Sequence, residues 1–203
     1  MRRAVLAVCL ALAACGSGDD VAVSRAKPEG AKLCGSNALR GEPAPPIPGK
    51  VRGCGLTDGV RVKWVAGIEL SQPATVDCAT AKALEDWVTG DVKPNLSRRG
   101  GGLSELKVFA SYTCRPRNNI VGAKISEHGR GKAVDIGGFV LADGTEITVL
   151  KGWSSKSEQP LLKRLQDEAC TIFGTVLGPR SDRYHANHFH LDTADHRGRS
   201  FCR

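Results

Sequence analysis

The sequence lacks several features that would assign it to a common class of protein. It contains no internal repeats and no low-complexity tracts. No dense run of lysine and arginine interleaves with aromatic residues, so the net charge of +8 does not indicate a nucleic-acid partner. No two cysteines stand at the close spacing of cysteine–zinc sites. The apolar run at residues 4–14 is too short to span a bilayer.

That apolar run instead indicates export. It follows two arginines and ends in small residues, which is typical of a secretory signal at residues 1–14. Residues 12–15 (Leu-Ala-Ala-Cys) resemble a bacterial lipobox, which implies cleavage before Cys15 and lipid attachment to it. Gly16 is not the aspartate that retains lipoproteins in the inner membrane, so we expect a periplasmic domain anchored to the outer membrane. An ordinary signal peptide with an incidental Cys15 is the alternative.

The mature chain of 189 residues fits one domain. Residues 15–33 are polar and read as a lipidated cysteine with a flexible tether, which leaves residues 34–203 as the folded domain. Loss of two arginines and no acidic residue lowers the net charge from +8 to +6. An anionic cell-wall polymer is a sensible partner for that charge. A solvated surface with a few extra lysines explains it equally well, and we expect a monomer.

Six further cysteines indicate disulfides. An even number of cysteines in an exported chain predicts up to three bonds in an oxidising compartment. The fifteen pairings that six cysteines allow stay open at this point. The candidates are Cys34, Cys54, Cys78, Cys114, Cys170 and Cys202.

The hydrophobic pattern predicts an α+β fold with a small antiparallel sheet and flanking helices. Alternation predicts strands at residues 61–70, 106–112, 133–141, 146–150 and 188–192. Helical spacing predicts one helix that begins after Thr75 or Asp77 and ends at Lys93–Pro94, and a second over residues 161–173. The proline-rich residues 42–48 should be extended.

Two segments carry the candidate chemistry, residues 126–135 and 185–192, and they hold four of the five histidines. Histidine and aspartate supply the ligands of catalytic zinc, which keeps three protein ligands and one open position. Strand alternation puts His190 and Asp135 on inward faces, and His128 comes from the loop before Asp135. Each residue taken singly is more readily a hydrogen-bonded core residue. Together they predict a three-ligand zinc (Zn2+) site.

The joint motif resembles a known group of enzymes. Ser-x-His-x-x-Gly-x-Ala-x-Asp followed by His-x-x-His-x-His resembles the LAS metallopeptidases, which include D-Ala-D-Ala carboxypeptidases and the penicillin-insensitive murein endopeptidase. Residues 34–203 are similar to the bacterial extensin-like C-terminal domain family. The segments that carry this second resemblance are Ala110–Asn118, Ser126–His128, Asp135–Phe139, Thr175–Pro179 and His188–Asp192.

The resemblance implies an LAS/hedgehog-like zinc peptidase core, stabilised by disulfides, with His128, Asp135 and His190 as the zinc ligands. It also implies that His185 is a catalytic histidine and that His188 is a second active-site histidine. The expected activity is zinc-dependent hydrolysis of amide bonds in the peptide stems or cross-links of peptidoglycan.

The resemblance is weaker at the arginines and at two positions beside the histidines. Arg115 corresponds to an arginine that steadies the substrate carbonyl or carboxylate, with Arg117 as the second choice, although both could be solvated loop charges. Gly129 stands where alanine is commoner. Asn187 stands where aspartate is commoner, which puts the orientation of His185 in doubt.

Two other functions stay open. One is a non-catalytic lipoprotein of the cell envelope that binds peptidoglycan, since binding alone needs neither a metal nor a base. The other is a zinc enzyme that cuts the amide between N-acetylmuramic acid and L-alanine. The sequence does not distinguish endopeptidase from carboxypeptidase activity.

Overall fold

A computed structural model describes residues 28–203 of the chain. The predicted signal (residues 1–14), Cys15 and most of the predicted tether lie outside the described residues. Strand β1, Ala31–Lys32, pairs with β2, Leu39–Pro43, and Leu33 is buried. The folded part therefore already includes residues before Cys34.

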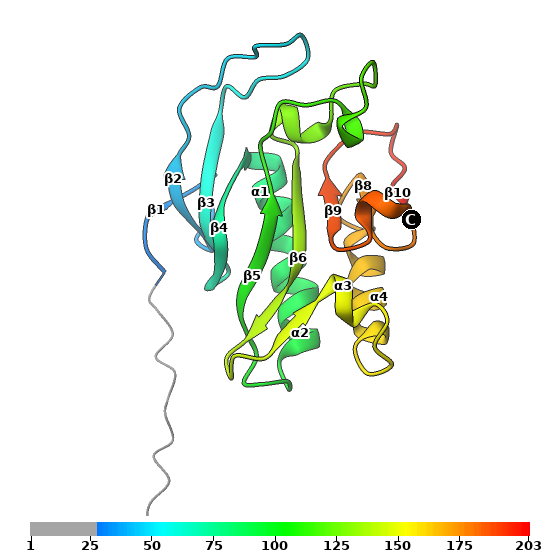
Figure 1. Cartoon of the computed structure of the whole chain (residues 1–203). Coiled ribbons are helices and arrows are strands. Elements are labelled where there is room, and N and C mark those ends of the chain that lie inside the picture. The colour runs from blue at the N-terminus through cyan, green and yellow to red at the C-terminus, as the bar shows by residue number, and fades with distance from the viewer. Residues whose placement is uncertain (1–27) are drawn as a thin grey trace, which may run out of the picture.

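One mixed sheet of ten strands organises the described region (Figure 1). The strands run in the order β1-β2-β3-β4-β5-β6-β9-β8-β10, and β7 pairs with β6. Neighbours are antiparallel except for β4 with β5 and β8 with β10. The α+β class is confirmed, but the sheet is larger than predicted and not wholly antiparallel. The remaining strands are β3 Gly59–Val65, β4 Ile68–Asp77, β5 Leu103–Ala110, β6 Ala133–Leu141, β7 Glu146–Thr148, β8 Thr175–Leu177, β9 Phe189–Asp192 and β10 Phe201–Cys202.

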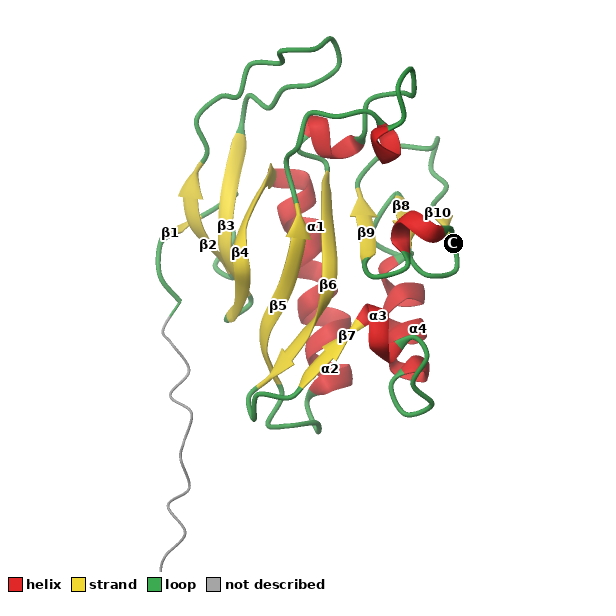
Figure 2. Cartoon of the chain, viewed as in Figure 1, coloured by secondary structure: helices red, strands yellow, loops and turns green. Residues whose placement is uncertain are grey.

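Helices cover one face of the sheet (Figure 2). Their bounds are α1 Cys78–Trp87, α2 Lys93–Leu96, α3 Val149–Gly152 and α4 Gln159–Ala169. Trp87 is fully buried, and its indole nitrogen donates to the carbonyl of Leu165 in α4 at 3.1 Å. This bond joins α1 to α4 above the sheet. None of the described helices is both long enough and apolar enough to cross a membrane.

Two predicted boundaries of secondary-structure elements are wrong, one at Gly67 and one at Pro94. The predicted strand 61–70 is divided between β3 and β4 by a turn at Ala66–Gly67, where φ is +50° and +79°. Such φ values suit the tight turns that join antiparallel strands. Pro94 does not end the first helix. A π-helical segment, Val88–Val92, follows α1, and Pro94 lies in the first turn of α2, where a missing N–H is tolerated.

Two other predictions have clear outcomes. Asp77 caps α1 by accepting a hydrogen bond from the Thr80 amide at 2.7 Å, whereas Thr75 belongs to β4. The predicted strand 146–150 ends at Thr148, because the Thr148 hydroxyl accepts from the Lys151 amide and starts α3. Both helix starts follow the ordinary rule that a side-chain oxygen satisfies a free amide of the first turn.

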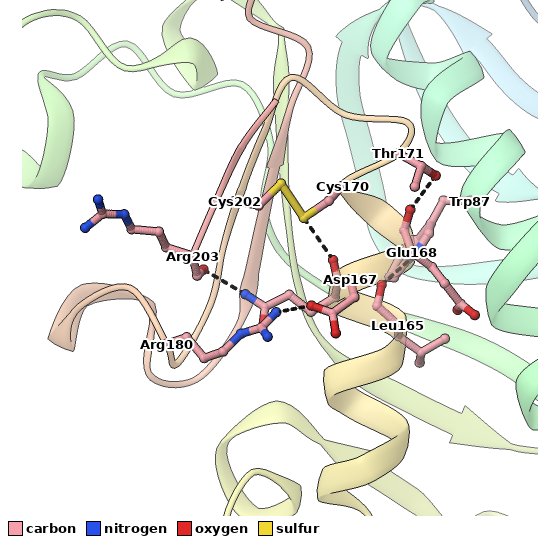
Figure 3. The surroundings of a disulfide bond; sticks show 10 residues. Trp87, Leu165, Asp167, Glu168, Cys170, Thr171, Arg180, Cys202 and Arg203 are labelled. Atoms are coloured by element: carbon pink, nitrogen blue, oxygen red, sulfur yellow. Dashed lines mark hydrogen bonds and ion pairs between the residues drawn. A yellow bond between two sulfur atoms is a disulfide. The ribbon is translucent and has the colours of Figure 1, made fainter. Parts of the chain in front are cut away.

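Three disulfides confirm the prediction from cysteine number and supply the pairing that the sequence left open. The pairs are Cys34–Cys78, Cys54–Cys114 and Cys170–Cys202. The last pair ties the end of α4 to β10, next to the ion pair of Arg180 with Asp167 (Figure 3). The amide of Gln166 also donates to the carbonyl of Arg203 at 2.8 Å. The C-terminal segment is thus held covalently and by hydrogen bonds.

Loss of the Cys54–Cys114 bond should weaken the fold. This bond closes a span of 60 residues between the loop before β3 and the segment after β5. We expect Cys54→Ser with Cys114→Ser to lower the free energy of unfolding by about 2–5 kcal/mol, because the bond restricts the unfolded chain. Urea unfolding of the variant and of the parental protein, both metal-free, would measure the difference. An unchanged free energy would contradict the expected contribution.

Candidate functional site

The pairing of β6 with β9 brings the first two candidate residues together. In this antiparallel pair Asp135 lies directly opposite His190. Their neighbours along each strand, such as Val134 and Leu191, are fully buried in the hydrophobic core. Because alternate residues of a strand face opposite sides, Asp135 and His190 must share the other face. The predicted strand alternation is confirmed here.

His128 reaches the same point from a 3-10 turn, Glu127–Arg130, that leads into β6. Gly131 ends this turn with φ of +69°, a value that favours glycine. Gly129 also leaves no room for a side chain, because a Cβ there would lie 2.9 Å from a methyl of Ile125 and 3.0 Å from Cys54 Sγ. The disulfide beside Gly129 therefore accounts for glycine at a position where alanine was expected.

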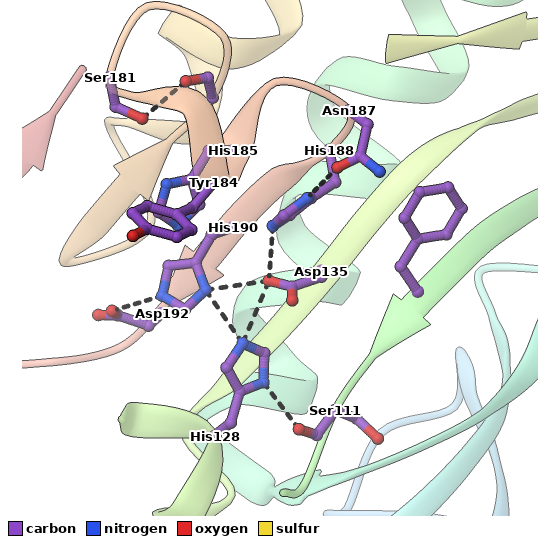
Figure 4. Close-up of polar contacts among 12 residues, drawn as sticks. Ser111, His128, Asp135, Ser181, Tyr184, His185, Asn187, His188, His190 and Asp192 are labelled. Atoms are coloured by element: carbon purple, nitrogen blue, oxygen red, sulfur yellow. Dashed lines mark hydrogen bonds and ion pairs between the residues drawn. The ribbon is translucent and has the colours of Figure 1, made fainter. Parts of the chain in front are cut away.

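Three ligand atoms converge at this place (Figure 4). His128 Nε2 lies 3.2 Å from Asp135 Oδ1 and 3.1 Å from His190 Nδ1, and the last two atoms are 3.0 Å apart. All three side chains are buried. Tetrahedral ligands bound to zinc at its usual bond lengths of about 2.0–2.1 Å are separated by roughly 3.3 Å. The spacing of the three atoms therefore suits one small cation, and they form a candidate metal group.

Hydrogen bonds on the far side of each imidazole fix which nitrogen faces inward. His128 Nδ1 lies 2.7 Å from the carbonyl oxygen of Ser111, which can only accept, so this nitrogen carries the proton. His190 Nε2 lies 3.0 Å from Asp192 Oδ2, and the same reasoning applies. In their neutral forms both histidines thus aim a lone pair at Asp135. Three acceptors that meet without a donor require a proton or a metal ion between them.

The charges around the site favour such a positive charge. Burial raises the pKa of Asp135, but hydrogen bonds and charges from His128 and His190 outweigh it and hold this pKa far below its ordinary value. Burial lowers the pKa of His190, yet its bonds to Asp135 and Asp192 raise that pKa to about 9. A metal-free site would accordingly keep a proton on His190 at neutral pH. A bound cation would take the place of that proton.

The other two histidines lie beside the ligand group. His188 Nε2 is 3.6 Å from Asp135 Oδ1, and its Nδ1 donates to the side-chain oxygen of Asn187 at 2.8 Å. Burial lowers the pKa of His188, although the charge of Asp135 opposes this, so its imidazole stays neutral at pH 7. The ring of His185 packs 5.3 Å from that of His188 and 5.8 Å from that of His190, between ring centres.

The carboxylate that orients His185 comes from Asp182. Its Oδ1 accepts from His185 Nδ1 at 2.8 Å and from the Tyr184 amide at 2.8 Å. Partial burial raises the pKa of Asp182, but the bond from His185 and those from nearby amides lower it below its ordinary value. The doubt raised by Asn187 is thereby resolved, since Asn187 serves His188 and an aspartate three residues before His185 serves His185.

A pocket of about 300 Å³ opens over these side chains. Arg115 and Arg117 both line it. The Arg117 guanidinium is already engaged with the carboxylate of Glu127 at 3.6 Å. Arg115 makes one long contact, 3.5 Å, to the carbonyl of Pro116, and no carboxylate of the described residues pairs with it. Of the two arginines, Arg115 is therefore the one that is free to bind a negatively charged or carbonyl oxygen of a ligand.

All six predicted site residues line one pocket, but three further groups at the site had no predicted role. Asp192 stands two residues after His190, and this i, i+2 spacing on one strand already signalled that the two side chains share a face. Asp182 had a weaker signal, as an aspartate three residues before a histidine at a helix start. The carbonyl of Ser111 had none, because a backbone acceptor leaves no trace in the residue type.

Comparison with known proteins places the chain in a family. A family model described as extensin-like protein C-terminus matches residues 32–203. The chain belongs to this family. The extensin-like domain thus covers nearly the whole described region, including all three disulfides and the three candidate metal ligands. Searches of curated proteins and of solved structures found no match.

Proposed function

We propose that this extensin-like protein is a zinc-dependent peptidase of peptidoglycan. The observation that carries the proposal is the convergence of His128 Nε2, His190 Nδ1 and Asp135 Oδ1 at separations of 3.0–3.2 Å. Each histidine is held by an acceptor on its other nitrogen, which is the usual support of metal-binding histidines. Two imidazoles and one carboxylate fit zinc and leave a fourth position open.

Zinc held by these residues would polarise a substrate carbonyl and make a water molecule acidic enough to attack it near neutral pH. His185 lies beside the ligand group with its Nδ1 fixed by Asp182, and no residue within 28–203 forms a hydrogen bond with its Nε2. It would accept the proton of the attacking water and return it to the leaving amine, as a general base and then a general acid. No covalent acyl intermediate is needed, so β-lactams should not inhibit the protein.

Two further residues complete the proposed machinery. Arg115 would bind the carbonyl oxygen as negative charge develops on it, because its guanidinium has no acidic partner among the described residues. His188 would face the substrate beside Asp135, 3.6 Å from that carboxylate, as a neutral imidazole. The remaining wall of the pocket would hold the peptide.

The substrate and location rest on the sequence and on chemistry. The lipobox-like segment before Cys15 and three disulfides suit an exported, lipid-anchored protein of an oxidising compartment. The resemblance of the ligand motif to LAS peptidases, with their zinc peptidase core, points to amide bonds of peptidoglycan stems or cross-links. We propose a periplasmic monomer anchored to the outer membrane.

Elemental analysis followed by digestion of purified muropeptides tests the proposal. We expect one zinc per chain, and new products of amide cleavage that disappear after chelation and return with zinc. Products cut between N-acetylmuramic acid and L-alanine would assign a different bond to the same centre. No metal, even after zinc is added back, together with retained binding to peptidoglycan sacculi, would favour a non-catalytic wall-binding lipoprotein.

The stability of the metal-free protein should fall as the pH rises. His190 has its pKa raised from 6.5 to about 9 in the folded state, so the proton it keeps stabilises the fold fully below about pH 6.5. That contribution is lost as the pH rises through about 9. Thermal unfolding of chelated protein between pH 6 and 9.5 would measure it, with zinc-loaded protein as the control. Identical pH profiles with and without zinc would contradict the exchange of proton for metal.

Arg115 and Arg117 should differ in their effect on turnover. We expect Arg115→Ala to lower kcat by about a hundredfold to a thousandfold, the usual cost of one oxyanion donor. Arg117→Ala should have a much smaller effect on kcat, because Arg117 is engaged with Glu127. Steady-state kinetics on one muropeptide, with metal content measured for both variants, makes the comparison. A larger loss for Arg117→Ala would reverse the assignment.

A further inference from the structure

A second pocket of about 320 Å³ lies next to the candidate metal site. Arg117, Glu127 and His196 line both pockets, so the two share a wall. The second pocket lies between the segment that leads into β6 and the segment that follows β9, which lie at the same end of the sheet in Figure 1. A ligand that extends from the metal site across this wall would enter the second pocket.

Positive charge dominates the second pocket. Four cations, Arg117, Lys124, Arg130 and Lys132, line it together with two carboxylates. The buried carboxylate of Glu127 is shared by Arg117 at 3.6 Å and Arg130 at 3.3 Å. Glu127 thus balances one of the two guanidinium charges, and neither lysine takes part in this cluster.

The acids do not neutralise those lysines. The other carboxylate, Asp195, accepts hydrogen bonds from the backbone amides of Arg197 and Gly198. Within residues 28–203, no hydrogen bond or ion pair engages the ammonium group of Lys124 or Lys132. Both side chains are exposed and line the hollow, so they can bind an anion without first breaking a contact in the protein.

Both lysines stand close in sequence to the candidate metal ligands. Lys124 precedes His128 by four residues, and Lys132 precedes Asp135 by three. The segment between them is fixed by the bridge of Pro116 with Ile125 and by the hydrogen bond from the Lys132 amide to the Glu127 carbonyl at 3.0 Å. An anion bound by the lysines would therefore set the position of the rest of a ligand over the metal site.

We propose that the second pocket is a subsite for a carboxylate of the same peptide that is cut at the metal site. The proposal rests on the proposed function, and it specifies the substrate as an acidic peptide stem with a free carboxylate to one side of the scissile amide. Lys124 and Lys132 bind that carboxylate, and Arg130, held by Glu127 and by the carbonyl of Gly53, also lines the pocket. The subsite selects acidic stems over amidated stems.

Paired peptides and paired variants test the subsite. The probes are a synthetic stem tetrapeptide and the same peptide with its carboxylates converted to carboxamides. Affinity is measured by calorimetry in the His185→Ala background, in which the peptides are not consumed. We expect Lys124→Glu with Lys132→Glu to weaken binding of the acidic peptide by roughly tenfold or more, the worth of one hydrogen bond to a charged group. Binding of the amidated peptide should change little.

The control variant is Lys151→Glu with Lys156→Glu, which makes the same change in net charge on exposed lysines that line neither pocket. It should keep the preference for the acidic peptide. Equal affinity of the two peptides for the background protein, including absence of binding to both, would overturn the subsite even if muropeptides are cleaved. A retained preference without any cleavage by the parental protein would support the subsite and overturn only the proposed function.

Discussion

The His190→Ala protein should contain no zinc at neutral pH and should cleave no muropeptide. His190 supplies one of three buried protein ligands and lies directly opposite Asp135 in the strand pair. Structural zinc sites with four ligands bind with about 10–16 kcal/mol, so one ligand is worth roughly 3 kcal/mol, or more than a hundredfold in Kd. Elemental analysis after dialysis against a weak chelator would measure the loss, and His128→Ala should behave alike.

Two further variants distinguish loss of the metal from loss of the fold. Asp135→Asn keeps the shape of its side chain and removes the charge, so it should lose zinc while the circular dichroism spectrum is unchanged. His196→Ala removes an exposed histidine that bonds to Thr175 and not to the ligand group, and it should keep one zinc per chain. Zinc retained at full occupancy in both His190→Ala and His128→Ala would show that the metal binds elsewhere.

The His185→Ala protein should give the opposite combination, with one zinc per chain and almost no turnover. His185 is not part of the ligand group, and its ring lies 5.8 Å from that of His190. Positioned general acids and bases contribute about a hundredfold to ten-thousandfold to rates, so we expect kcat to fall by that range. Single-turnover digestion of a purified muropeptide, with metal content measured on the same sample, makes the test.

A variant of Asp182, which holds His185, gives a second test of the role of His185. Asp182→Asn would keep a hydrogen-bond acceptor for His185 and lose the charge, so its kcat should fall less than that of His185→Ala. Full activity in His185→Ala would remove this histidine from the mechanism and leave His188, whose Nε2 faces Asp135, as the remaining candidate base.

The parts of the site that could be predicted are those governed by strand periodicity. Val134 and Ile136 alternate with Asp135, and Phe189 and Leu191 alternate with His190, so burial of the apolar residues determines where the polar ones point. The positions of His128, Asp135 and His190 relative to one another follow from that alternation together with a short turn. Periodicity also located the two main helices.

The parts that could not be predicted depend on contacts between distant segments. The pairing of Cys54 with Cys114 follows from the path of two loops, and six cysteines alone allow fifteen arrangements. The apolar alternation of β3 continues through Ala66–Gly67 into β4, so the sequence pattern does not show the turn between them. The positive φ values at these two residues reveal it. Asp182 became a partner of His185 only once the 3-10 turn Arg183–His185 was visible.

The direct opposition of Asp135 and His190 in the strand pair has a consequence for folding. Slippage of β9 along β6 by one residue would turn one ligand away from the other and bring Phe189 and Leu191 out of the core. A chain that holds a cation between these two side chains has therefore paired its central strands in the native alignment. Metal content would then serve as an assay of correct strand alignment in refolded protein, independent of any measurement of enzymatic activity.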